Sequence, residues 1–127
     1  MQTVKILNLT KSFGKIRAVD SLSLDIEKGK ITGLIGADGS GKTTLIRLIT
    51  GLLIPDSGEI TVLGLNPAAQ KEELSTKIGY MPQKFGLYED LSIEENLQLY
   101  ADLKKLPYEF DELLEFTKLM PFKTRLA

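Results

Sequence analysis

Hydrophobic and polar residues alternate along the first part of the chain as they do in half-buried β-strands. Leu22, Leu24 and Ile26 take every second position, with polar residues between them. Successive side chains of a strand point to opposite faces of a sheet, so this spacing predicts a strand with one buried face. A similar alternation begins at Val4 and Ile6 and then slips by one position. Further short apolar runs predict strands at Ile31–Ile35, Ile60–Leu63 and Lys77–Met81.

Two helices are predicted in the middle of the chain. Apolar residues recur at intervals of three and four between Lys42 and Leu53, which gives that helix one buried face, and the Pro55–Gly58 segment ends it. Asn66 and Pro67 suit the start of a short helix that runs to about Ser75, because proline fits the first helical position. The predicted buried face of the first helix consists of Leu45, Leu48, Ile49, Leu52 and Leu53.

The last third of the chain is predicted to be helical. Ser92 and Glu95 have the spacing of a capping box, in which each side chain bonds the backbone N–H of the other residue. The helix that follows is closed by Pro107, and one more helix ends before Pro121. The apolar positions of the two helices are Ile93, Leu97, Tyr100 and Ala101 in the first, and Phe110, Leu113, Leu114 and Thr117 in the second.

Composition narrows the possible classes of function. The chain has 127 residues, 43% of them hydrophobic and 26% charged, which suits one modest core. Its formal net charge of −1 gives no basic surface for nucleic acid. Cysteine and histidine are absent, which excludes disulfides, thiol catalysis and the common zinc sites. The N-terminus has no signal-peptide design and no apolar stretch is long enough for a bilayer, so we expect a cytoplasmic location.

Candidate chemistry is concentrated in residues 36–43. They read Gly36-Ala37-Asp38-Gly39-Ser40-Gly41-Lys42-Thr43, a complete G-x-x-x-x-G-K-[ST] phosphate-binding loop between an apolar run and an amphipathic helix. Glycines let such a loop turn its backbone N–H groups inward, and a helix N-terminus adds further N–H groups that attract anions.

Each later position of this loop has a role in binding a Mg²⁺ nucleotide. Lys42 is expected to reach the β- and γ-phosphates, and the Thr43 hydroxyl to complete the shell of Mg²⁺. Thr44 would bind the α-phosphate through its N–H or its hydroxyl. Asp38 is expected to point outward, because a carboxylate facing phosphate is unfavourable.

The order of motifs resembles the nucleotide-binding domain of ABC transporters over essentially the whole chain. Lys11-Ser12-Phe13-Gly14 is similar to the A-loop of that family, and residues 36–44 match its Walker A sequence with the doubled threonine. Residues 51–60 are close to the family's link to the next strand, residues 78–83 to its Q-loop, and residues 91–97 to the start of its helical subdomain. Residues 83–88 most resemble the ATPase subunits of drug-export systems.

The resemblance implies roles for residues outside the phosphate loop. Phe13 stands where the family stacks an aromatic ring, more often Tyr, on adenine, and such stacking tolerates different bases. Gln83 stands where the family contacts Mg²⁺, the γ-phosphate or the attacking water. Phe85 and Tyr88 follow on the segment that faces the membrane subunit, where they serve either as aromatic anchors or as core residues.

The resemblance also implies an α/β fold of the P-loop NTPase type. We expect one ABC nucleotide-binding domain fragment: an antiparallel β-subdomain, the Walker A strand and helix, and the start of the helical subdomain. Residues 1–83 would form the nucleotide-binding core and residues 84–127 the start of the helical subdomain. The family's signature motif, Walker B carboxylates and switch histidine do not occur in the sequence, so we expect a domain truncated before them, without a catalytic residue of its own.

The function expected from this resemblance is that of an ATP-binding subunit of an ABC transporter. Its cofactors would be ATP and Mg²⁺, and its partners a transmembrane subunit at the Q-loop region and a second nucleotide-binding domain at the cytoplasmic face of the membrane. Alternatives are a soluble ABC ATPase without a transport role and a nucleotide-binding module without turnover. A small-molecule kinase would need a lid rich in arginine, whereas Arg17, Arg47 and Arg125 are scattered.

Overall fold

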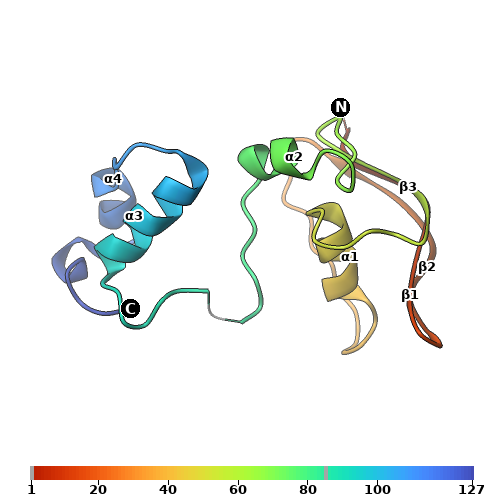
Figure 1. The fold of residues 1–127 in the computed structure, drawn as a ribbon, viewed down its shortest axis with the longest axis horizontal. Coiled ribbons are helices and arrows are strands. Elements are labelled where there is room, and N and C mark those ends of the chain that lie inside the picture. Colours follow the sequence, from red (N-terminus) through yellow and green to blue (C-terminus); the bar gives the residue numbers. More distant parts are fainter. Residues whose placement is uncertain (1, 85) are drawn as a thin grey trace. The chain divides into compact units, whose positions relative to one another are not determined.

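The computed structural model describes residues 2–84 and 86–127, which form two compact units. The first unit extends to Tyr80 and holds the strands and the first two helices, and the second extends from Met81 to Ala127 (Figure 1). Each unit is described by itself below. The assignment of residues 1–83 and 84–127 to two functional parts of one domain stays a prediction.

The first unit is built on a three-stranded antiparallel sheet in the order β2-β1-β3. Its strands are β1 (Gln2–Phe13), β2 (Ile16–Glu27) and β3 (Ser57–Val62), and a tight turn joins the first two. Strands are therefore confirmed in all three regions, although β1 and β2 are longer than the alternation alone predicts. Val4 lies opposite Ile26 on one side and Val62 on the other.

The slip in the alternation after Ile6 corresponds to an irregularity in the sheet. The pairing of β1 with β2 shifts between Ile6 and Leu9, and Asn8 has a φ of 49°. The side-chain hydroxyl of Ser23 accepts the Asn8 N–H at 2.8 Å, so the bulged backbone keeps a hydrogen bond. As a result Leu9 turns into the core while Leu7 is half exposed.

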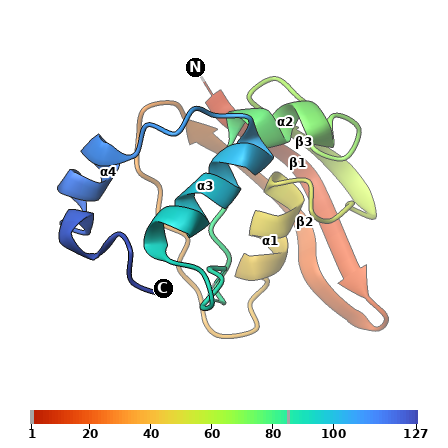
Figure 2. The same ribbon diagram turned by 60° about the vertical axis from the view of Figure 1, so that its left-hand side comes forward.

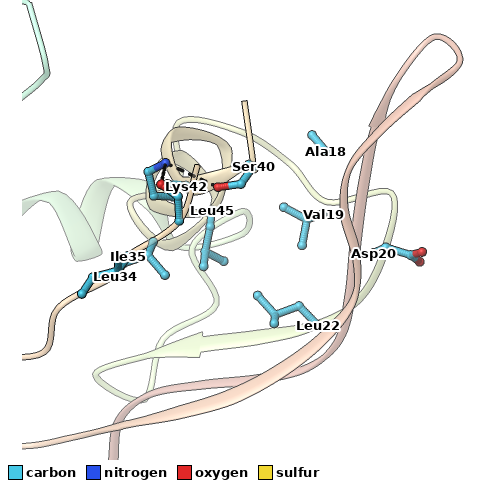
Figure 3. A pocket seen from close by; sticks show the side chains of 11 residues that line it. Ala18, Val19, Asp20, Leu22, Leu34, Ile35, Ser40, Lys42 and Leu45 are labelled. Atoms are coloured by element: carbon cyan, nitrogen blue, oxygen red, sulfur yellow. Dashed lines mark hydrogen bonds between the residues drawn. The ribbon is translucent and has the colours of Figure 1, made fainter. Parts of the chain in front are cut away.

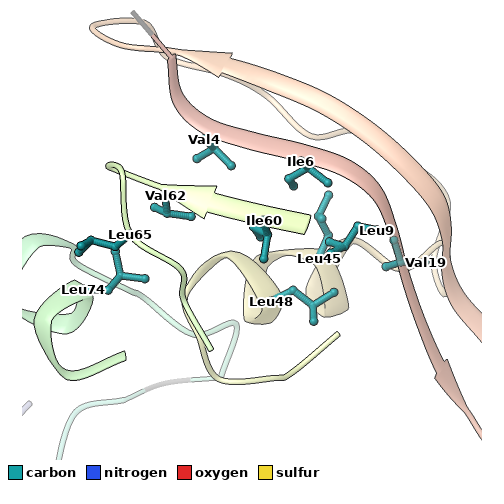
Figure 4. Packing of buried hydrophobic residues seen from close by; sticks show 10 residues of the cluster. All are labelled: Val4, Ile6, Leu9, Val19, Leu45, Leu48, Ile60, Val62, Leu65 and Leu74. Atoms are coloured by element: carbon teal, nitrogen blue, oxygen red, sulfur yellow. The ribbon is translucent and has the colours of Figure 1, made fainter. Parts of the chain in front are cut away.

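The core of this unit forms where α1 (Lys42–Ile49) packs on the sheet. Leu45 and Leu48 from the helix meet Ile6, Leu9 and Ile60 from the strands (Figure 4). Burying an aliphatic side chain of this size contributes roughly 1.5–3 kcal/mol, so these contacts fix the helix against the sheet. The N-terminus of α1 is thereby held in place.

The helix α1 ends earlier than its apolar pattern predicts. It stops at Ile49, because the Thr50 hydroxyl donates to the Ile46 carbonyl at 3.0 Å and the Leu52 N–H to the Arg47 carbonyl at 2.8 Å. These bonds close the helix with Gly51 in the left-handed conformation, a common C-terminal arrangement. The predicted extension to Leu53 was wrong, since the bonds that cap the helix precede the proline by several residues.

The helix α2 (Lys71–Lys77) also differs from its predicted limits. The Asn66 side chain accepts the N–H groups of Ala68 and Ala69 at 2.9 and 3.1 Å, as a cap does, but the residues it caps form a turn. The regular helix starts at Lys71 and includes Lys77. The predicted strand Lys77–Met81 is therefore wrong: its first residue is helical and the others belong to no strand.

The predicted strand at Ile31–Ile35 is absent as well. This segment has no regular structure, and its ends are fully open, with Ile31 105% and Ile35 96% exposed. A strand requires a partner for its backbone N–H and C=O groups. The sheet of the described residues contains only β2, β1 and β3, so neither of the two missing strands finds that partner.

The second unit is helical, with α3 (Ile93–Lys104), α4 (Asp111–Phe116) and a short 3-10 helix, η1 (Met120–Phe122) (Figure 2). The predicted capping box is confirmed: the Ser92 hydroxyl accepts the Glu95 N–H at 3.2 Å, and the Glu95 carboxylate accepts the Ser92 N–H at 2.7 Å. On α3 the most deeply buried side chains include Asn96, 2% exposed, whereas Tyr100 is half exposed.

Candidate nucleotide-binding site

The site begins at the N-terminus of α1, which opens onto the loop of residues 36–41. Gly41 is the N-cap, and its carbonyl accepts the first helical bond from the Leu45 N–H at 2.9 Å. The next three N–H groups, those of Lys42, Thr43 and Thr44, have no partner within the helix. Gly41 supplies no side-chain cap and the first turn has no acidic residue, so the positive end of the helix dipole faces the loop.

The side chain of Lys42 turns back into the loop. Its ammonium donates to the carbonyl oxygens of Gly36 and Ala37, each at 2.6 Å, and to the Ser40 hydroxyl at 3.4 Å (Figure 3). The cation thus sits at the centre of a ring of oxygens. Phosphate oxygens carry negative charge, so they attract the ammonium more strongly than neutral carbonyl oxygens do. The loop therefore presents one cation and several N–H groups to an anion.

Glycine is required at the point where this loop meets the sheet. A Cβ atom on Gly41 would lie 2.0 Å from the carbonyl oxygen of Ala18, and the residue has a φ of 92°. A Cβ atom on Gly36 would lie 2.6 Å from the Ser40 hydroxyl. The loop therefore packs so closely, against Ala18 at Gly41 and against Ser40 at Gly36, that a side chain is excluded at both positions.

A cavity of about 320 Å³ lies behind the loop, between β2 and the start of α1 (Figure 3). Val19, Leu22 and Leu45 point toward it, whereas Asp20 points away. Gly36, Ser40, Gly41 and Lys42 of the phosphate loop line it as well, so the cavity opens onto the loop. Most of its remaining lining is apolar, so the hydrogen-bond donors for phosphate lie on the loop side of the cavity.

Phe13 lies at the end of β1, opposite Ile16, and 49% of it is exposed. The β1–β2 turn beside it and the loop of residues 36–41 lie at the same end of the first unit in both views (Figures 1 and 2). The Lys11 ammonium is 5.7 Å from the centre of the Phe13 ring, within the range of a cation–π contact. The ring is thus accessible at the end of the unit that carries the loop.

The remaining predicted site residues lie at exposed positions of the loop, in the second unit, or outside the described residues. Asp38 is exposed, as are Ala37 and Gly39. Gln83 lies in the second unit, in a bend that precedes α3, and Phe85 falls outside the described residues. Tyr88 is 54% exposed, while the Asn96 side chain bonds its backbone N–H and carbonyl, both at 2.9 Å.

Sequence reasoning missed a contact near Phe13. Asp56, which follows α1 and precedes β3, accepts the Lys11 ammonium at 2.8 Å and the Ser12 N–H at 2.7 Å. The Lys11 hydrogen bond, and then that of Ser12, lower the pKa of the Asp56 carboxyl below its usual value. No local pattern connects residues so far apart in the sequence. The only signal was the position of an acidic residue directly before a strand.

Residues 19–127 match the family-level profile described as ABC transporter. The chain belongs to the ABC transporter family. It is 55% identical over 115 residues to the probable multidrug ABC transporter ATP-binding protein YbhF of Escherichia coli, covering 87% of this chain and 20% of that protein. It is 36% identical over 121 residues to the sulfate/thiosulfate import ATP-binding protein CysA of Thermosynechococcus vestitus, covering 91% of this chain and 36% of that protein.

Solved structures of this family have the same fold. A structure described as the ATP-binding subunit of an ABC transporter aligns with a TM-score of 0.85 and 26% identity, covering 98% of this chain and 54% of that one. The ABC-type P-loop fold predicted from the sequence is thereby confirmed. The chain spans about half of that solved subunit and about one fifth of YbhF.

Proposed function

We propose that this chain binds ATP together with Mg²⁺ through the loop of residues 36–44. The observation that carries the proposal is the ring of loop oxygens around the Lys42 ammonium, next to three helical N–H groups without intrahelical partners. In this role Lys42 contacts the β- and γ-phosphates, the free N–H groups in the first turn of α1 surround them, and Thr44 contacts the α-phosphate.

Mg²⁺ would be bound jointly by the protein and the nucleotide. In the described residues, no group of three or more acidic side chains gathers that would hold a metal ion without the nucleotide. Mg²⁺ commonly uses one or two protein ligands together with phosphate oxygens and water. The Thr43 hydroxyl, in the first turn of α1, is the ligand we assign. Gln83 is proposed as the second contact, to Mg²⁺ or to the attacking water.

Phe13 is proposed as the platform for the adenine base. Its ring is about half exposed, and the β1–β2 turn that follows it lies at the same end of the first unit as the phosphate loop (Figure 1). Stacking on an aromatic ring stabilises a bound base by about 1–3 kcal/mol and depends little on which base is bound. We therefore expect affinity for other purine triphosphates close to that for ATP.

The whole protein is proposed to use ATP hydrolysis to drive export through a membrane. Identity to YbhF, named as a multidrug transporter component, is 55%, against 36% for the importer subunit CysA, which favours export. Among the described residues, no helix combines the length and apolar character that crossing a bilayer requires. We propose a place at the cytoplasmic face of the membrane, with a transmembrane partner at residues 83–88 and a second nucleotide-binding domain.

The 127 residues themselves are proposed to bind ATP without turning it over. The sequence contains no strand followed by an Asp-Glu pair and no signature motif. Hydrolysis in P-loop enzymes needs a group that orients water and groups that stabilise transition-state charge, beyond the Lys and Mg²⁺. Phosphate release by the 127-residue chain is expected to stay at background.

A competition experiment tests the binding proposal. A fluorescent ATP analogue is displaced by ATP, inorganic triphosphate or AMP, each with and without Mg²⁺. We expect ATP and triphosphate to compete, AMP to fail, and removal of Mg²⁺ to weaken the two competitors that carry β- and γ-phosphates. Equal competition by AMP and ATP would contradict the assignment of the loop as a polyphosphate site.

A further inference from the structure

The end of β1 that carries Phe13 lacks a strand partner on one side. The pairing of β1 with β3 ends at Thr10, opposite Ser57, while the pairing with β2 continues to Phe13. Beyond Thr10, the N–H groups on the β3 side of β1 need another acceptor. A strand end with hydrogen bonds on one side only is expected to be mobile.

Asp56 takes the place of the missing strand. Its backbone N–H donates to the Thr10 carbonyl at 2.9 Å, and its carboxylate accepts the Ser12 N–H at 2.7 Å. The side chain thus extends the β1–β3 hydrogen bonding by one step toward Phe13. The second carboxylate oxygen accepts the Lys11 ammonium at 2.8 Å.

Lys11 connects this carboxylate with the aromatic ring. Its side chain is only 17% exposed, and its ammonium lies over the Phe13 ring at 5.7 Å from the centre. The ammonium therefore has Asp56 as its ion-pair partner and one face of the ring as its neighbour. A ring covered on one face by a fixed cation offers its other face to a ligand.

The Lys11–Asp56 pair differs from the other ion pairs described in the first unit. Arg17–Asp20, Lys30–Glu27 and Lys77–Glu73 each join residues three or four positions apart, with side chains that are 45–67% exposed. Lys11–Asp56 joins residues 45 positions apart, and its lysine is largely shielded from water. The Asp56 side chain is 44% exposed, so what distinguishes this pair is the packed Lys11 side chain together with the second hydrogen bond that the carboxylate accepts from the Ser12 N–H. With two partners on β1, the carboxylate is held in one geometry.

From these contacts we propose that Asp56 is a positioning residue for the nucleotide base. It fixes the end of β1 through Ser12 and the cation through Lys11, and so sets the orientation of the Phe13 ring on which the base stacks. This inference rests on the proposed role of Phe13, and it assigns Asp56 an effect on the base but none on the phosphates.

The test compares Asp56→Ala and Asp56→Asn with a matched control. Glu73→Gln breaks an ion pair of the same 2.8 Å length in the same unit, on α2. For each variant, displacement of a fluorescent ATP analogue gives the affinity for MgATP and for inorganic triphosphate. We expect Asp56→Ala to weaken MgATP about three- to tenfold, since part of the stacking energy is lost, and to leave triphosphate unchanged. Asp56→Asn should lie between, because its amide oxygen still accepts the Ser12 N–H.

Two readouts keep the outcome decisive. The ¹H and ¹³C shifts of the Phe13 ring should change in Asp56→Asn and stay unchanged in Glu73→Gln, whether or not Asp56→Ala folds. With Phe13→Ala as background, Asp56→Asn should have no further effect on MgATP. Equal losses for MgATP and triphosphate, or no loss at all, would overturn the role of Asp56 while Phe13→Ala remains selective for ATP. A Phe13→Ala variant without that selectivity would overturn the base platform itself and this inference with it.

Discussion

A Cβ atom on Gly41 would lie 2.0 Å from the carbonyl oxygen of Ala18. Gly41 closes the phosphate loop and caps α1, while Ala18 belongs to β2. The loop is thus pressed against the backbone of the sheet at the residue that precedes Lys42. The position of the helix N-terminus depends on a contact that only glycine allows.

Gly41→Ala is therefore expected to destabilise the chain and to abolish nucleotide binding. Gly29→Ala is the matched control, because Gly29 also has a positive φ, 77°, but a Cβ atom there meets nothing within 4 Å. In both variants an alanine must adopt a positive φ, which lowers stability. Only Gly41→Ala adds a steric clash, which lowers stability by a further amount of about 1–3 kcal/mol. Urea unfolding and ATP titration of the two variants measure the difference. Equal stability and equal binding would show that the contact with Ala18 is unimportant.

Phe13→Ala is expected to weaken MgATP by about 1–3 kcal/mol and to leave inorganic triphosphate unaffected, because the base alone loses its stack. Phe13→Tyr keeps the flat ring and should bind like the parent chain. Displacement of a fluorescent ATP analogue measures both ligands. If Phe13→Ala weakens ATP and triphosphate alike, the ring supports folding and does not bind the base.

The capping box of α3 predicts a dependence of stability on pH. The Ser92 N–H, and then the Ser92 hydroxyl, lower the pKa of Glu95 below its usual 4.5. A lowered pKa in the folded state means that the stabilisation is complete above pH 4.5 and is lost as the pH falls through and below that value. Glu95→Gln cannot titrate, so its stability should fall less between about pH 5 and 3 than that of the parent chain.

Urea midpoints at several pH values measure this difference. The control is Glu112→Gln, which removes the same charge from the first turn of α4, a helix without a side-chain cap. Glu112→Gln should keep the pH dependence of the parent chain. A pH dependence that is the same in all three chains would show that the Glu95 bond is not a stabilising contact in solution.

The exposed segment of residues 31–35 predicts self-association of the 127-residue chain. Ile31 and Ile35 are almost entirely open, and extended backbone without a partner recruits other chains. Ile31→Lys should lower the mean mass measured by light scattering. Ile54→Lys, at an exposed position outside the segment, should leave it unchanged. A monodisperse monomer of the parent chain would contradict this prediction.

Features with a local cause could be predicted from the sequence. The capping box of Ser92 and Glu95 depends on residues three positions apart, and the phosphate loop on eight consecutive ones. The strand at Leu22–Ile26 packs one face against the core, so the alternation of apolar and polar residues in the sequence predicts it. In the first two cases the interacting groups are neighbours in the sequence, and in the strand the alternation itself marks the face that is buried.

Features that depend on distant partners could not be predicted in this way. Ile31–Ile35 has the composition of a strand, but strand formation is decided by a neighbour and not by the segment. Asp56 reaches Lys11 through the fold alone. Asn96 is polar and buried, because backbone groups of Tyr88, Leu91 and Ser92 satisfy its side chain, which no pattern of apolar residues indicates.

The most direct test of the account is the affinity for MgATP of Lys42→Ala compared with Lys71→Ala. Lys42 lies at the centre of the phosphate loop, whereas Lys71 is an exposed lysine at the start of α2. Both variants remove one positive charge, so a difference in their affinity for MgATP reflects where the lysine lies and not the loss of charge alone. Bonds to charged groups contribute about 1.5–3 kcal/mol, so Lys42→Ala should weaken the binding of a fluorescent ATP analogue at least about tenfold, and Lys71→Ala should leave it unchanged. Equal affinities of the two variants would contradict the assignment of this loop as the nucleotide site.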